Sequence, residues 1–287
     1  MTKDLLFANR VAVLATMHHK EKVIAPIIER DLGIKVLVPP DFDTDRFGTF
    51  TREKERTGTQ IEAARLKAET AMAVTGETLA LASEGTFGPH PSSPFIPCNR
   101  EIVILLDKTN DLEIIGQSFS TDTNYSHRVV TSLQEALEFA TKVGFPEHAL
   151  VVMLNSAPTS KDEIIKGITS QQQLVEAVEL ALTHSDNGKV HIETDMRALY
   201  NPTRMKNIKR ATYDLIKKIQ NPCPQCFFPS FELIQTKPGL PCAWCNSPTQ
   251  LTLAAIYKCK KCGFNKEVLF PDGLQNAEPG LCMYCNP

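Results

Sequence analysis

The chain has little net charge, no long apolar run and none of the features of a secreted protein. Its 287 residues include 31 basic and 33 acidic side chains, so it has no overall attraction to nucleic acid or to an anionic membrane. No apolar run approaches the length of a bilayer span, and the opening residues MTKDLLFANR contain no signal-peptide core. We therefore expect a cytoplasmic protein that does not enter a membrane.

Cysteine is nearly absent from the first 220 residues, and arginine is absent from residues 221–287. The single early cysteine, Cys98, is expected to be a buried apolar side chain rather than a nucleophile. The other eight cysteines all fall after position 220. This change in composition predicts two domains, an α/β domain at residues 1–220 and a smaller metal-binding module at residues 221–287.

The late cysteines form four Cys-x-x-Cys pairs, which indicate zinc sites in a chain without a signal peptide. Two residues between thiolates allow both sulfurs of one turn to bind one ion, and two such turns complete a tetrahedral site. The similar halves CPQC…KPGLPCAWCNSP and CKKC…EPGLCMYCNP favour sequential pairing into two tandem zinc ribbons over a cross-braced arrangement. A redox role for one pair is the alternative interpretation. The eight predicted zinc ligands are Cys223, Cys226, Cys242, Cys245, Cys259, Cys262, Cys282 and Cys285.

A closed four-cysteine site leaves no position for water or substrate, so we predict two structural zinc ions and place any catalysis elsewhere. Residues 221–287 contain five lysines and four acidic residues. Two zinc-bound centres of four thiolates would make this module net acidic. Because nucleic-acid binding draws on clustered cations, nucleic acid is not the favoured partner. Docking to another protein, or a homo-oligomer, is the alternative role.

Helices alternate with short apolar strands along residues 1–220, which predicts a three-layer α/β domain with a mixed sheet. Its central stretch is Gly58–Pro91, interpreted as a helix, a turn, a strand and a Gly-rich loop. We expect no regular structure in the proline-rich segment 86–99. The strands Glu101–Leu106 and Leu112–Phe119 are expected to form an antiparallel hairpin.

Two acidic residues of the central stretch are candidate catalytic residues. The expected strand Thr78–Ala82 ends just before Glu84, and ligands of open α/β sheets bind at the carboxyl ends of strands. Glu84 therefore stands where a cation or a water molecule can be held. Glu62 has two interpretations, because Thr59-x-x-Glu62 is a helix capping box and the same carboxylate is a candidate metal ligand.

Basic residues near an early helix start are candidate phosphate ligands. The expected strand Val11–Thr16 is followed by His18, Lys20 and Lys22 at the start of a helix. A strand, turn and helix start present backbone N–H groups to a phosphate, so Thr16 joins this set. A solvated helix start is the alternative interpretation.

Two further groups carry weaker signals. Arg197 and Arg204 lie near the start of the last basic helix, where they suit a clamp for phosphate or carboxylate. A solvated basic helix face is the alternative. Asp43 and Asp45 are candidate ligands of Mg²⁺, in a turn whose composition is also common without a metal.

Several of these motifs resemble the inosine triphosphate pyrophosphatase superfamily. ATMHHKEKVIAPIIE is similar to the opening strand, turn and helix of those enzymes. Glu62-Ala-Ala64-Arg-Leu-Lys67-Ala68 is similar to their helix signature Glu-x-Ala-x-x-Lys-Ala, and Ser83-Glu84-Gly85 resembles their acidic strand end. The resemblance covers residues 10–120. The whole chain looks like a bacterial family of unknown function that joins such a domain to zinc ribbons.

Those enzymes cleave aberrant purine nucleoside triphosphates to monophosphate and pyrophosphate with Mg²⁺. The resemblance implies that Lys67 and either Lys20 or Lys22 hold phosphates, and that Glu62 and Glu84 hold metal or position water. We therefore predict a Mg²⁺-dependent hydrolase of a nucleotide or related phosphate ester. The alternative is a non-enzymatic protein whose zinc module and basic helix bind RNA or a protein partner.

Overall fold

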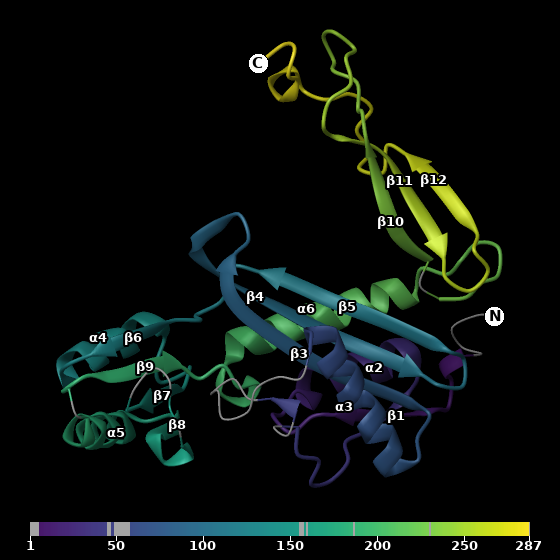
Figure 1. The fold of residues 1–287 in the computed structure, drawn as a ribbon. Helices are drawn as coiled ribbons and strands as arrows, with labels where there is room; N and C mark the ends of the chain where they lie inside the picture. Colours follow the sequence, from purple (N-terminus) through teal and green to yellow (C-terminus); the bar gives the residue numbers. More distant parts are fainter. Residues whose placement is uncertain are drawn as a thin grey trace. The chain divides into compact units, whose positions relative to one another are not determined.

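A computed structural model describes residues 6–44, 47–48, 58–154, 158, 160–185, 187–229 and 231–286. The chain divides into two compact units, which are described separately (Figure 1). One comprises Phe7–Ile216, and the other contains the residues from Lys217 onward. Within the described ranges, every helix is too short or too polar to span a bilayer.

The larger unit contains a mixed sheet built from β1 (Val11–Ala15), β2 (Lys35–Leu37), β3 (Leu79–His90), β4 (Ser93–Asp107) and β5 (Leu112–Ser120). The strand order is β2-β1-β3-β4-β5. β1 pairs in parallel with β2 and β3, whereas β4 pairs antiparallel with β3 and β5. β1 and β3 are therefore the adjacent parallel strands at the centre of the sheet.

Helices cover both faces of this sheet. α2 (Glu21–Leu32) leads from β1 to β2, and α3 (Gln60–Thr75) precedes β3 on the other side of β1. Connections between parallel strands are right-handed, so these two helices lie on opposite faces. The small residues of α3 pack with alternate residues of the central strands in one core, which includes Ala64, Ala68, Ala71, Met72, Val13, Ala80, Ala82 and Ile104.

α6 (Pro202–Ile219) lies on the face opposite α3. Ile115 of β5 packs against the α3 core, so its neighbour Gly116 points to the other face. There the α6 backbone approaches so closely that a Cβ at Gly116 would lie 2.5 Å from Leu215 Cβ. The predicted three-layer α/β architecture with a mixed sheet is confirmed.

The prediction that the proline-rich segment 86–99 lacks regular structure is wrong. β3 and β4 pair continuously from Leu79↔Asp107 to Pro89↔Pro97. Prolines are tolerated at this end of the hairpin because, among the described residues, no strand pairs with the outer edge of β3 beyond Ala82 or with that of β4 before Asn99. The expected hairpin of β4 and β5 is present and turns at residues 108–111.

A second sheet, not predicted as a separate layer, follows within the same unit. Its strands are β6 (His127–Val130), β7 (Leu150–Met153), β8 (Ile164–Ile168) and β9 (Val190–Thr194), in the antiparallel order β6-β9-β7-β8. α4 (Leu133–Val143) and α5 (Gln171–His184) share one apolar core with it. Three of the four β6 residues are exposed, so this strand has no apolar signal in the sequence.

The C-terminal unit contains the antiparallel strands β10 (Phe231–Pro238), β11 (Thr252–Cys259) and β12 (Asn265–Leu269), paired in that order. The four Cys-x-x-Cys turns lie before β10, between β10 and β11, after β11, and after β12. Consecutive strands run in opposite directions, so consecutive turns alternate between the two ends of the sheet.

Candidate functional site

Buried charged side chains gather where β1 ends beside β3. The last residue pair joins Ala15 of β1 to Ala82 of β3, so Ser83 and Glu84 extend past the end of β1. Successive side chains of a strand point to opposite faces. Glu84 therefore shares the α3 face with Ala82, whereas Ser83 points to the opposite layer.

On the α3 face, Lys67 Nζ forms an ion pair with Glu84 Oε1, and the two side chains are only 7% and 6% exposed. Lys67 also lies 5.9 Å from the centre of the Phe47 ring. The Gln60 amide donates hydrogen bonds of 2.8 Å to the carbonyl oxygens of Glu84 and Arg100. The first two turns of α3 thus fix both the side chain and the backbone of Glu84.

On the other face, Lys20 at the start of α2 donates hydrogen bonds to the Ser83 hydroxyl at 3.0 Å and the Ser83 carbonyl at 3.2 Å. Burial, together with the nearby cations of Arg204 and Lys67, lowers the pKa of Lys20 to about 7. Glu84 and Glu101 act in the opposite direction. An anion that arrived beside Lys20 would restore the charged ammonium, because an opposite charge favours ionisation.

A third buried pair joins α6 to β4. Arg204 Nε donates to Glu101 Oε1 at 2.9 Å, and both side chains are 0% exposed. Asn99 Nδ2 donates to the same oxygen at 2.9 Å, and Arg204 Nη1 donates to the Met196 carbonyl. The pair lies over Gly85, where a Cβ would be 2.7 Å from Arg204 Nη2. Glycine is required here because any side chain would displace the pair.

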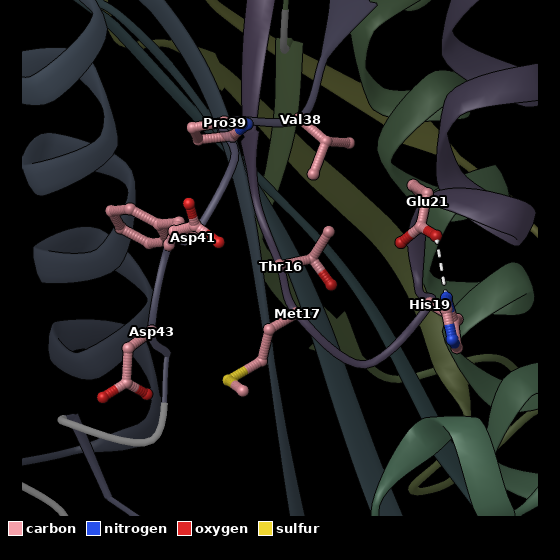
Figure 2. A pocket seen from close by; sticks show the side chains of 9 residues that line it. Thr16, Met17, His19, Glu21, Val38, Pro39, Asp41 and Asp43 are labelled. Atoms are coloured by element: carbon pink, nitrogen blue, oxygen red, sulfur yellow. Dashed lines mark hydrogen bonds and ion pairs between the residues drawn. The ribbon is translucent and has the colours of Figure 1, made fainter.

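A pocket of about 470 Å³ lies at the turn that carries Lys20; its lining is Thr16, Met17, His19, Glu21, Val38, Pro39, Asp41, Phe42 and Asp43. Figure 2 shows Asp41 and Asp43 on one side and His19 with Glu21 on the other, with Thr16 between them. Thr16 Oγ1 is buried and has no hydrogen-bond partner among the described residues. The carboxylates of Asp41 and Asp43 could supply oxygen ligands of the kind that Mg²⁺ prefers.

Glu62 lies outside this cluster and serves the helix cap. Its carboxylate accepts a hydrogen bond from the Thr59 amide at 2.7 Å, and Thr59 Oγ1 accepts one from the Glu62 amide at 3.3 Å. The hydrogen bonds from Thr59 lower the pKa of Glu62. Five residues separate Glu62 from Lys67, which is about 140° around a helix. Glu62 therefore points away from the Lys67–Glu84 pair.

The other sequence candidates are dispersed. Lys22 is exposed on α2, and His18 is buried in the preceding turn. Arg197 is held by Asp195, with 2.6 Å between Nη2 and Oδ2, and stacks on Tyr200 at 4.6 Å from the ring centre. Asp45 lies outside the described residues. The family resemblance grouped Lys20, Lys67 and Glu84 in one predicted site, whereas Arg204 was a separate candidate. Glu101 was not predicted, because its only signal in the sequence is an acidic residue at the start of the apolar run EIVILL.

The cysteines form two tetrads with zinc-site geometry; these are Cys223, Cys226, Cys259 and Cys262, and Cys242, Cys245, Cys282 and Cys285. All four sulfurs of each tetrad lie within 4.8 Å of one another. Sulfur separations across the paired turns are 3.7 and 3.6 Å in the first tetrad and 3.8 and 3.7 Å in the second. A tetrahedron with Zn–S bonds of about 2.3 Å has edges of about 3.8 Å. Each tetrad could therefore hold one structural zinc ion.

Electrostatics within the second tetrad also favour a bound cation. Hydrogen bonds from the Ser247 hydroxyl and amide lower the pKa of Cys245 to about 6. The neighbouring sulfur of Cys245, together with burial, raises the pKa of Cys285 to about 12. The four thiols therefore do not all ionise near neutral pH unless a cation neutralises them.

The prediction of sequential pairing is wrong, because the turns pair first with third and second with fourth. The strand directions give the reason. The end of β10 that begins at Phe231 pairs with Cys259 at the end of β11, and the opposite end pairs Pro238 with Thr252. Cysteine turns at the same end of the sheet are therefore close enough to share an ion, whatever their order in the chain. The internal similarity of the two halves did not carry this information.

A family model described as a domain of unknown function (DUF6671) matches residues 67–287. The chain belongs to this family. The DUF6671 match begins at Lys67 and includes Glu84, Glu101, Arg204 and both cysteine tetrads. A search of curated proteins gave no match. The predicted membership in an uncharacterised family is thus confirmed, and the comparisons supply no link to the inosine triphosphate pyrophosphatases.

Proposed function

We propose that the larger unit is a Mg²⁺-dependent hydrolase of a nucleotide or a related phosphate ester. The observation that supports this most is that three buried charged residues, Lys20, Lys67 and Glu84, lie where β1 ends beside β3, Lys20 on one face of the sheet and the other two on the opposite face. The neighbours of Lys20 in its turn also line a pocket. Ligands of open α/β sheets bind outside the carboxyl ends of parallel strands. The resemblance of the same residues to the inosine triphosphate pyrophosphatases points to the same chemistry.

The two lysines would bind the phosphate groups. A phosphate beside Lys67 would share its ammonium with Glu84, and a phosphate beside Lys20 would draw that side chain into its charged form. Burial makes both attractions stronger than they would be in bulk water. Charge that develops on the phosphate oxygens during hydrolysis would be stabilised by groups already in place.

Glu84 would orient the attacking water, since its carboxylate is fixed by Lys67 and its carbonyl by Gln60. Asp41 and Asp43 line one side of the pocket and would hold Mg²⁺ through carboxylate oxygens, with water completing its coordination. When bound, the metal neutralises phosphate charge and orients the leaving group. The tetrads of the C-terminal unit would hold two zinc ions in a structural role.

A panel of nucleoside triphosphates, diphosphates and simple phosphate esters, assayed with Mg²⁺ for released phosphate and pyrophosphate, tests the proposal. We expect turnover by the wild type and a loss of at least 100-fold in kcat for Glu84→Gln. Glu113→Gln is the matched control, because Glu113 also pairs with an α3 cation, Arg65, at 2.7 Å, but this pair is only partly buried. Absence of turnover in the wild type, or full turnover in Glu84→Gln, would overturn the proposal.

A further inference from the structure

The C-terminal unit exposes large apolar side chains around one cysteine tetrad. Trp244 is 77% exposed, Tyr284 74%, Met283 68% and Leu281 59%. Buried aromatic and aliphatic residues are the rule in a folded domain, whereas contiguous exposed ones mark an interaction site. These four residues are named the knuckle patch.

The second tetrad holds the knuckle patch together. Trp244 lies between Cys242 and Cys245, whereas Met283 and Tyr284 lie between the other two ligands, Cys282 and Cys285. Because all four sulfurs lie within 4.8 Å of one another, the two turns are neighbours. The Trp244 amide also donates to Cys242 Sγ at 3.4 Å. The two turns therefore bring the four exposed side chains to the same end of the unit, with a combined exposed area on the order of 500 Å² for side chains of this size.

Charge is distributed unevenly over this unit. Residues 238–257 and 268–286 contain no lysine or arginine, and Asp272 and Glu278 are exposed among them. A zinc centre with four thiolates adds two negative charges to this end. Four of the five lysines instead lie near the first tetrad, namely Lys258, Lys260, Lys261 and Lys266. The fifth, Lys237, lies at the second-tetrad end of β10 and is paired with Glu267 at 2.9 Å. Apart from this paired lysine, the charged side chains in the segments around the knuckle patch are acidic.

We propose that the knuckle patch is a docking surface for a protein segment that presents apolar side chains flanked by lysine or arginine. Complementary charge across an interface accelerates association and excludes wrong partners. A nucleic acid would meet an acidic surface without clustered cations. Two copies joined symmetrically would place like charges against each other, because such an interface brings the same patch of each subunit together. A peptide that is both basic and apolar would have charge opposite to that of the surface and would bury its apolar side chains against the patch.

Selection from a random peptide library displayed on phage, with the full-length zinc-loaded chain as target, tests the proposal. We expect enriched peptides that combine aromatic or aliphatic residues with at least two basic residues. Trp244→Ala should weaken binding of the synthesised peptides at least tenfold, and Glu278→Lys several-fold. Ile234→Ala is the matched control, because Ile234 is a 54% exposed apolar residue on β10, and it should leave affinity unchanged. Zinc content of two ions per chain in every variant shows that the unit is folded.

Several results would overturn the proposal. One is selection of no peptide, or of peptides that are acidic or uncharged. Another is unchanged affinity in Trp244→Ala. Sedimentation that shows a wild-type oligomer converted to monomer by Trp244→Ala would assign the patch to a second copy. Binding of labelled poly(U) RNA that Trp244→Ala abolishes would assign it to nucleic acid. None of these results bears on hydrolysis by the larger unit, so the two proposals fail independently.

Discussion

Replacing Gly85 with alanine should disrupt the buried Glu101–Arg204 pair. The new Cβ would lie 2.7 Å from Arg204 Nη2 and 2.9 Å from Glu101 Cδ, well inside contact distance. Neither side chain can move aside into solvent, because both are 0% exposed. Breaking a buried ion pair costs about 3–5 kcal/mol, since each uncompensated charge stays in a medium of low dielectric. We expect a loss of stability of that size.

Urea unfolding followed by circular dichroism, with zinc in excess, measures this loss. Gly88→Ala is the matched control, because Gly88 lies on the same strand and a Cβ there would meet no described atom within 4 Å. That variant should change the free energy of unfolding by less than about 1 kcal/mol. A Gly85→Ala protein as stable as Gly88→Ala would show that the pair does not hold α6 against the sheet.

Three other predictions concern packing, pH and metal. Gly116→Ala should lower the free energy of unfolding by about 3 kcal/mol or more in the same assay, because its Cβ would lie 2.5 Å from Leu215 Cβ on α6. A stability near that of the wild type would contradict this close approach of α6 to β5. The pKa of Lys20 falls from 10.5 to about 7 on folding, so between these values the unfolded chain binds the extra proton. The free energy of unfolding of the wild type, compared with that of Lys20→Met, should therefore rise by up to about 1.4 kcal/mol per pH unit between pH 7 and 10. The same pH dependence in both proteins would contradict the burial of Lys20. Metal analysis should find one zinc in the double variant Cys226→Ser/Cys262→Ser and none in Cys226→Ser/Cys245→Ser; the reverse result would restore sequential pairing.

Local signals in the sequence were sufficient to predict several of the helices and strands that surround the candidate site. The capping box of Thr59 and Glu62 and the apolar run of β4 each depend on neighbours within a few residues. The Gly-rich loop expected after Ala82 is instead part of β3, which continues through Glu84 to His90. The mixed sheet followed from the alternation of helices and strands. The predicted capping box is present, and in it the Thr59 amide donates a hydrogen bond to the Glu62 carboxylate.

Contacts between residues far apart in the sequence could not be predicted from such local signals. Glu101 and Arg204 are 103 residues apart, and nothing in either segment indicates the partner. The pairing of the cysteine turns depends on strand direction in a sheet whose strands carry many exposed residues. In the segment 86–99, proline content suggested a loop, although the free edge of a hairpin accommodates proline. Each of these features depends on how distant segments pack together in the folded chain.

The central claim is that phosphate chemistry occurs at Lys20, Lys67 and Glu84. The most direct measurement is ³¹P NMR of nucleoside triphosphates incubated with Mg²⁺ and either the wild type or Lys67→Met. We expect the substrate resonances to be replaced by those of product with the wild type and to persist with Lys67→Met. Unchanged spectra with the wild type, or equal conversion by Lys67→Met, would contradict it.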